Sequence, residues 1–184
     1  MSLVMRAIKV LLALIIFAGV VLWFAARRGD RGYFEEEVTI NRPAPVVFRW
    51  LTADELLRRW ISDLNKLETT AGSPGQSNSI YFIDEFIGGQ RVSLSARTVR
   101  LMPNEELELA VSPAKEPIGS FYADAKFKLL PSGEYTKISF SSQTNYTTLG
   151  DQVFEPILTY ATQRKVREDL RRLKLMIEAE AASR

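Results

Sequence analysis

The strongest hydrophobic signal in the chain lies near its start. Residues 10–26 read VLLALIIFAGVVLWFAA and contain no charged or strongly polar side chain. A helix rises about 1.5 Å per residue, so this run nearly crosses a hydrocarbon layer of about 30 Å. Extended to residues 8–26, with Lys9 reaching back to the interface and Trp23 at the other end, it predicts a transmembrane helix.

A cleaved signal peptide is the main alternative, because its basic start and apolar core have the same pattern. Phe24 places a bulky ring where a cleavage site needs a small residue, and a chain without cysteine excludes lipoprotein processing. We therefore expect residues 1–32 to form an anchor with its basic flank and residues 33–184 to form one domain. Basic residues flank the span on both sides, so the pattern predicts a single-pass protein of a bacterial membrane without fixing the side of the domain.

Beyond the anchor the periodicity changes to that of strands. Phe34, Val38 and Ile40 alternate as in a half-buried strand, and Pro43 and Pro45 then favour a helix start. A second short helix is predicted over residues 55–60, capped by Thr52 or Asp54. Further strands are predicted over residues 65–70, 79–87, 91–102, 107–111, 121–130 and around 138–140, with Gly88-Gly89 as a hairpin turn.

The last segment, residues 151–182, has apolar residues near helical spacing and predicts one long helix with Asp151 as its cap. A run of antiparallel strands has one apolar face to bury, and this helix is the only predicted element large enough to cover it. The expected fold is α+β, a curved antiparallel sheet wrapped around the C-terminal helix. Such a sheet tends to leave a cavity beside the helix, which the short helices close at one end.

The opening of the domain resembles a known family. The segment VTINRPAPVVFRWLTADELLRRW is similar to the start of the helix-grip domains of the START-like superfamily, also called SRPBCC or polyketide cyclase-like. The matching positions are Ile40, Pro43, Pro45, Val47, Phe48, Leu51, Thr52, Leu56, Leu57 and Trp60, and RKVREDLRRLKLMIEAE resembles the family's final helix. The resemblance implies the helix-grip fold, which hosts lipid carriers, cyclases, ligand receptors and chaperone activators. Ile61 replaces an aromatic residue frequent in the chaperone-activator branches, so that activity is not carried over.

Composition excludes several classes of chemistry. The chain has no histidine and no cysteine, which removes the usual catalytic triads, thiol nucleophiles and most zinc sites. We expect neither a metal nor a cofactor. The net charge of +2 belongs to the arginines and lysines beside the anchor, and the domain itself is slightly acidic. A nucleic-acid partner is therefore not expected.

Two carboxylates are candidate acids or bases. Asp84 shares its alternation with Ile80, Phe82 and Phe86, and on a cavity face its pKa would rise through burial. It could equally lie at a strand edge or pair with Arg97 or Arg100. Glu36 shares the alternation of Phe34 and also fits a cluster of charges at the start of the strand.

The expected cavity wall combines aromatic and aliphatic side chains with a few polar ones. Ser142 and Thr144 follow Ile138 and Phe140 at period two, which suits polar groups that orient a ligand but also half-exposed strand ends. The residues predicted to line the cavity are Trp50, Trp60, Phe82, Asp84, Phe127, Phe140, Ser142, Thr144 and Leu158.

Three functions fit these observations. The first is a membrane-anchored module that binds a hydrophobic or amphipathic small molecule, such as a lipid or isoprenoid, in a cavity between the sheet and the C-terminal helix. The second is a cyclase- or hydrolase-type enzyme that uses Asp84 or Glu36. The third is a tethered module for an unknown protein partner, which a large exposed apolar patch would favour. The basic residues of the last helix fit either a solvated face or anionic lipid headgroups.

Overall fold

The computed structural model describes residues 8–17, 19, 32–114 and 121–182. The chain divides into two units, Met1–Arg31 and Gly32–Arg184. Residues 8–17 are helical. Within the described ranges, no helix is both long and apolar enough to cross a membrane. Residues 18 and 20–26 of the predicted span lie outside the described residues, so the anchor stays a prediction.

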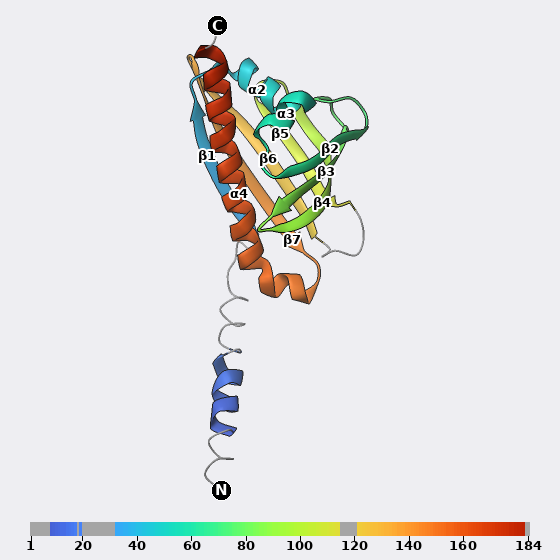
Figure 1. Ribbon diagram of the computed structural model, residues 1–184, viewed down its shortest axis with the longest axis vertical. Coiled ribbons are helices and arrows are strands. Elements are labelled where there is room, and N and C mark those ends of the chain that lie inside the picture. Colours follow the sequence, from blue (N-terminus) through green and yellow to red (C-terminus); the bar gives the residue numbers. More distant parts are fainter. Residues whose placement is uncertain (1–7, 18, 20–31, 115–120, 183–184) are drawn as a thin grey trace. The chain divides into compact units, whose positions relative to one another are not determined.

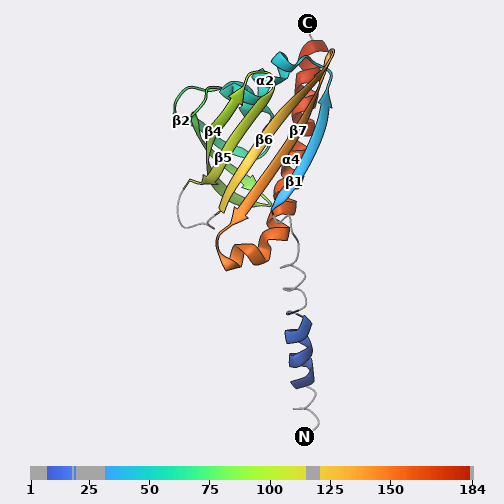
Figure 2. The same cartoon turned by 180° about the vertical axis from the view of Figure 1, so that it is seen from behind.

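The second unit is built on one antiparallel sheet of seven strands (Figures 1 and 2). Its spatial order is β1-β7-β6-β5-β4-β3-β2, so only β1 and β7 pair across a long stretch of sequence. The strands are β1 Tyr33–Ile40, β2 Leu64–Ala71, β3 Ile80–Ile87, β4 Gln90–Met102, β5 Glu106–Pro113, β6 Phe121–Ser132 and β7 Tyr135–Tyr146. The predicted α+β order is confirmed, and β7 continues through the polar stretch after Phe140.

Helix α4, Leu149–Ala182, runs along the concave side of this sheet. It contacts the edge strand β1, its neighbour β7 and, across the curve of the sheet, β3. The cap is Thr148 rather than the predicted Asp151. The Thr148 hydroxyl accepts a hydrogen bond from the Asp151 backbone N–H at 3.1 Å and donates one to its carboxylate at 2.5 Å. This reciprocal arrangement resembles a capping box and begins the helix two residues earlier than predicted.

Two short helices, α2 Ala44–Thr52 and α3 Asp54–Trp60, cover the other end of the concave face. Helix α2 contacts β6 and β7, and α3 contacts β2 and α4. Neither predicted cap of α3 is right, since Ala53 precedes the helix and no side chain caps it. Thr52 instead donates its hydroxyl to the Phe48 carbonyl at 2.9 Å, and Asp54 accepts a hydrogen bond from Thr69 at 2.8 Å.

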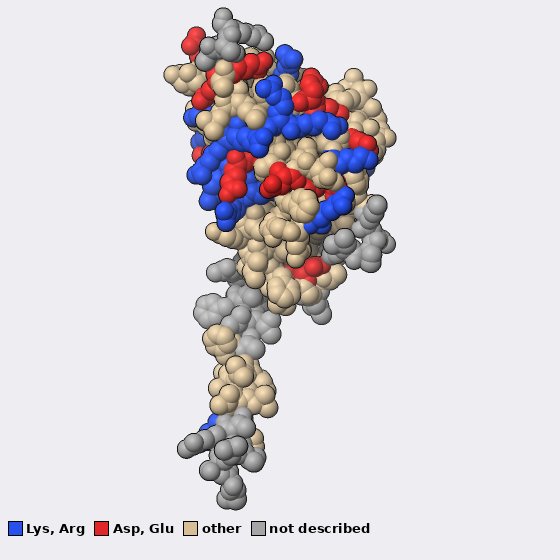
Figure 3. Space-filling model, in the orientation of Figure 1, with Lys and Arg blue, Asp and Glu red and all other residues tan. Residues whose placement is uncertain are grey.

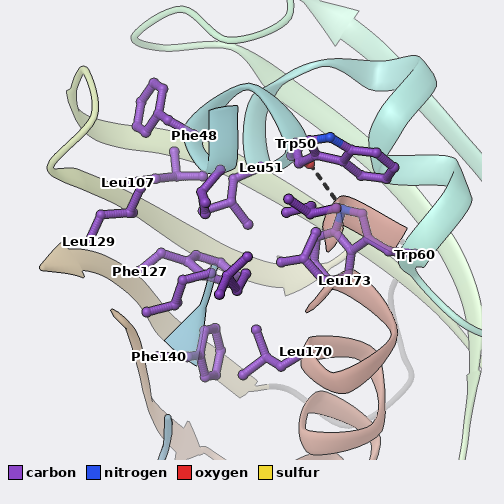
Figure 4. Packing of buried hydrophobic residues seen from close by; sticks show 14 of the residues in the cluster. Phe48, Trp50, Leu51, Trp60, Leu107, Phe127, Leu129, Phe140, Leu170 and Leu173 are labelled. Atoms are coloured by element: carbon purple, nitrogen blue, oxygen red, sulfur yellow. Dashed lines mark hydrogen bonds between the residues drawn. The ribbon is translucent and has the colours of Figure 1, made fainter. Parts of the chain in front are cut away.

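The core lies between the concave face and these three helices (Figure 4). Leu170, Leu173 and Ile177 repeat at helical spacing on α4 and are almost fully buried. They meet the inward side chains of the strands, among them Phe140 and Phe127. Trp60 donates its indole N–H to the Trp50 carbonyl at 3.0 Å, which joins α3 to α2.

The contribution of the α4 contact to stability is testable at Leu173, whose side chain is fully buried. Replacing Leu173 with alanine is expected to lower the free energy of unfolding by about 2–5 kcal/mol, because the substitution leaves a cavity in a packed core. Urea unfolding of the full chain in a mild detergent measures this loss. The control is Leu175→Ala on the exposed side of the same helix, with an expected change within about 0.5 kcal/mol. Equal effects at the two positions would contradict the packing described here.

Candidate functional site

A small apolar cavity of about 110 Å³ lies between the concave face of β2–β6 and the helices α2 and α3. Most of its lining side chains are aliphatic or aromatic. Those from the helices and the adjoining residue are Leu51, Thr52, Leu57, Trp60 and Ile61, and those from the strands and a loop are Leu67, Gly75, Tyr81, Ile83, Ala96, Thr98, Leu107, Leu109 and Phe127. An apolar space of this kind favours an apolar ligand group over water.

Aromatic packing confines the cavity to this end of the domain. Phe140 contacts Phe127 with ring centroids 4.7 Å apart and Phe34 with centroids 5.8 Å apart. These rings, together with Leu170, fill the space between β1, β7 and α4. Figure 4 shows Phe127, Phe140 and Leu170 of this group. In the described part of the domain, the interior is therefore solid beside α4 and open beneath α3, so the predicted cavity between the sheet and the C-terminal helix is wrong in its position.

A few polar groups border the cavity. Tyr81 accepts a hydrogen bond from the Gly75 backbone N–H through its hydroxyl oxygen at 2.9 Å. Thr52 and Thr98 also line the wall, and Thr98 is almost fully buried. Sparse hydroxyl groups in an apolar wall are the usual means by which a pocket orients a ligand.

The structure distributes the predicted cavity residues over several environments. Trp60 and Phe127 line the cavity, while Trp50 and Phe140 belong to the packed core. Ser142 and Thr144 share the concave face with Phe140 but lie outside the cavity lining. The prediction for Leu158 is wrong, because this residue is exposed on α4 and does not line the cavity.

Phe82 and Asp84 were also predicted to line the cavity, but both lie on the outer face of the sheet. In the register of β3 against β4, Tyr81 and Ile83 face the cavity together with Ala96. Strand β3 reads IYFIDEFI and is apolar on both faces, so its alternation did not identify the inner one. An acid on the outer face has no contact with the cavity.

Asp84 is held in a dense set of hydrogen bonds although it lies on the outer face. Its carboxylate accepts hydrogen bonds from the Arg91 guanidinium, the shortest at 2.6 Å, from Asn65 at 2.6 Å and from Ser93 at 3.2 Å. The Arg91 guanidinium, followed by Asn65, holds the pKa of Asp84 well below its ordinary value. The group is a fixed anion that ties β2, β3 and β4 together.

Glu36 faces the concave side, the orientation that the alternation suggested, but it is an ion-pair partner of α4. Arg167 donates to its carboxylate at 2.6 Å and Gln163 donates at 2.8 Å. The Arg167 hydrogen bonds lower the pKa of Glu36. Like Asp84, this carboxylate stays ionised at neutral pH.

A buried charge cluster escaped the sequence analysis. Lys165 of α4 lies 2.8 Å from a Glu85 carboxylate oxygen and 2.6 Å from one of Asp169, which also accepts the Ser62 backbone N–H at 2.7 Å. Burial raises the pKa of Glu85 against the opposing effect of Lys165. Glu85 shares its parity with Tyr81 and Ile83, so the correct face of β3 would have revealed it. The cluster joins β3, α4 and the turn after α3 beside the cavity.

A second hollow opens on the surface near the end of α4. It measures about 300 Å³ and is lined by Arg42, Pro45, Val46, Arg49, Trp50, Ile177 and Glu180. The Arg59 guanidinium also lies 4.9 Å from the centre of the Trp50 ring.

Within the described ranges, no group of three or more acidic side chains is placed to hold a metal ion.

Comparisons with solved structures identify the fold. No protein-family model and no curated protein sequence matches the chain. The chain is similar to the ZhuI aromatase/cyclase of Streptomyces sp. R1128, with a TM-score of 0.69 and 17% identity over 81% of this chain and 94% of that one. It is also similar to a START superfamily protein of Mycobacterium smegmatis, with a TM-score of 0.65 and 14% identity over 80% and 97% of the two chains. A protein of Thermus thermophilus gives a TM-score of 0.66 at 17% identity, over 80% and 98%.

These similarities show that the domain has the START-like helix-grip fold, as the sequence resemblance implied. At such low identity, the similarity shows the architecture of the domain and does not identify a ligand.

The Asp84–Arg91 pair predicts a specific dependence of stability on pH. A carboxylate with a lowered pKa in the folded state contributes stability above its unfolded pKa, and that contribution is lost as the pH falls toward the folded value. Asp84→Asn should therefore lower Tm at pH 7, and the difference from the wild type should shrink below about pH 4, near the ordinary value of 3.8. Thermal unfolding followed by circular dichroism from pH 7 to pH 3 measures it.

The control for this experiment is a double-mutant cycle with Arg91→Gln. The coupling between the two substitutions should be present at pH 7 and should weaken on acidification. A coupling that is absent at pH 7, or that does not change with pH, would contradict the role of Arg91.

Proposed function

We propose that this protein is a membrane-anchored module that binds a hydrophobic or amphipathic small molecule in the cavity beneath α3. The observation that carries the proposal is the apolar cavity itself, which is lined by Trp60 and Phe127 and bordered by hydroxyl groups. Removing the apolar part of the ligand from water contributes the binding free energy, about 25 cal/mol per Å² of buried apolar surface. The similarity to a START superfamily protein and to an aromatase/cyclase supports this function, because both share the architecture of this domain.

The volume of the cavity limits what it holds without rearrangement. Typical ligand pockets measure about 300–1,000 Å³, whereas this one measures about 110 Å³. It suits an aromatic ring or a short alkyl or isoprenoid end, since an engineered protein cavity of about 150 Å³ binds benzene. A longer molecule leaves its remainder outside or displaces lining side chains such as Leu57.

Binding is favoured over acid–base catalysis by the state of the carboxylates. Asp84 and Glu36 are both ionised partners of arginine, with lowered pKa values. A general acid or base works best with a pKa near the working pH, which neither group has. The buried Glu85 forms an ion pair with Lys165 and does not line the cavity.

Ala96→Leu tests the cavity, because Ala96 is buried and its side chain lines the space. The larger side chain fills part of the volume that the ligand needs. Keeping as little as two methylene groups of the ligand out of the cavity costs about 1.6 kcal/mol, or about tenfold in affinity. The full chain is purified from its own host in a mild detergent, and retained small molecules are identified by mass spectrometry. We expect one species at reproducible stoichiometry in the wild type and about tenfold less in the variant.

The matched control is Ala110→Leu, on the adjacent strand and with its side chain on the opposite face. This variant experiences the same detergent and should retain the ligand at the wild-type level. Thermal unfolding of the three proteins verifies that each is folded. A wild-type protein that retains no specific molecule, or equal retention by all three proteins, would refute binding in this cavity.

The anchor is the second part of the proposal and has its own test. The full chain should stay in the membrane fraction after an alkaline carbonate wash and be released by detergent. Ile16→Arg together with Phe17→Arg should move it to the soluble fraction, because each arginine at the centre of a span costs about 2.5–3.5 kcal/mol. The control pair is Ile16→Leu with Phe17→Leu. Release of the wild type by carbonate, or a mature N-terminus beyond residue 26, would favour the signal peptide instead.

A further inference from the structure

The first turns of α4 carry an exposed apolar surface. Val153, Phe154, Ile157 and Tyr160, which we call the α4 patch, are 53–66% exposed. Val153, Ile157 and Tyr160 follow one another at i, i+4 and i+7, so they share one side of the helix. Solvated helix faces are normally polar, and a contiguous apolar stripe at this exposure is typical of an interaction surface.

Pro156 accounts for the exposure of these turns. It has no backbone N–H, so the helical hydrogen bond to the Gln152 carbonyl is missing, and its ring bends the helix. Figures 1 and 2 show the bend in the orange part of α4, where the first turns leave the line of the rest of the helix. The long part of α4 packs on the sheet, and the first turns project beyond it.

The point at which the chain enters the domain is fixed against the same turns. The Gly32 backbone N–H donates to the buried Glu155 carboxylate at 2.7 Å, and the Gly32 carbonyl accepts from the Thr144 N–H at 2.9 Å. Gly32 has φ +70°, and a Cβ there would lie 2.1 Å from the Thr144 oxygen, so only glycine fits. Whatever precedes Gly32 in the chain therefore starts from beside the α4 patch.

The predicted span ends at Ala26, six residues before Gly32. Six residues reach at most about 22 Å when fully extended. With the anchor in a bilayer, Gly32 and the adjoining turns of α4 are held within this distance of the end of the span. The inference therefore rests on the proposed anchor, and it names the bilayer surface as the occupant of the patch.

The distribution of charge agrees with this placement. Charged side chains gather over the part of the domain farther along α4, and few are seen near its first turns (Figure 3). Of the two acids there, Asp151 is paired with Thr148 and Glu155 is buried. Arg164 follows Tyr160 at i+4 on the same side of the helix. Its guanidinium forms an ion pair with Glu168 at 3.0 Å. An aromatic residue followed by an arginine is the order expected where a helix leaves the interface.

We propose that the α4 patch lies in the interfacial layer of the membrane and forms a second attachment of the domain beside its anchor. The domain is then held in one orientation on the bilayer. Its occupant is a lipid surface, and a protein partner or a second copy of the chain is the alternative that the test separates.

The absence of cysteine allows a direct test, because a single introduced cysteine is the only labelling site. Ile157→Cys and, as a matched control, Leu175→Cys are labelled with an environment-sensitive nitrobenzoxadiazole dye. The two positions are 66% and 67% exposed and lie on the same side of α4, five helical turns or about 27 Å apart. The full chain is reconstituted into vesicles of phosphatidylcholine with some phosphatidylglycerol, with and without nitroxide-labelled lipids.

The label at residue 157 should emit at shorter wavelength in vesicles, and nitroxide lipids should quench most of its emission. The label at residue 175 should be unchanged in both respects. Equal quenching at the two positions, or none at residue 157, would overturn the proposal. A blue shift at residue 157 without lipid quenching would also overturn it and would identify a second copy of the chain as the occupant.

Flotation of the same vesicles separates this inference from the anchor on which it rests. Vesicles that carry the protein but do not quench the label at residue 157 leave the anchor intact and refute the patch. Protein that does not float with the vesicles refutes both.

Discussion

The contact between α4 and the concave face of the sheet is the interaction on which the rest of the domain depends. Leu170, Leu173 and Ile177 bury the apolar side of the helix against strands that come from both ends of the sequence. Strand β1 is an edge strand and pairs only with β7, so without α4 its inward face would be exposed to water. The aromatic cluster of Phe34, Phe127 and Phe140 fills the space beside the helix, and this solid packing is the reason that the cavity lies beneath α3 instead.

The charges of the domain serve the same contact. Glu36 is joined to Arg167, and Glu85 is joined to Lys165, so two strands at different positions in the sheet are each tied to α4 by an ion pair. Two basic residues of α4, Lys165 and Arg167, thus form ion pairs within the domain. A helix whose cations already have carboxylate partners has less attraction for anionic headgroups, and for this reason the proposed membrane contact relies on the apolar first turns.

The sequence predicted the order of elements because strand and helix periods are read locally, and Pro43, Gly88 and Gly133 mark the boundaries. The site was predicted less well. Strand β3 has apolar residues on both faces, so alternation alone placed Phe82 and Asp84 on the inner side. Trp60 and Phe127 line the cavity, whereas Phe140 lies in the solid core, because the division between cavity and core depends on tertiary packing. The exposure of Leu158 likewise follows the bend at Pro156, whose extent a periodic pattern does not give.

The two proposals together constrain the ligand. The turn after α3 meets α4 at Asp169, through the hydrogen bond from Ser62, and the cavity lies beneath α3. Asp169 follows Ile157 by twelve residues, or about 18 Å along the helix. If the long part of α4 runs away from the bilayer from the α4 patch, the cavity lies beyond the hydrocarbon layer. In that arrangement the ligand reaches the cavity by leaving the membrane or from water. An amphipathic molecule that partitions between the two phases meets this condition, and its apolar end gains the apolar environment that the cavity provides.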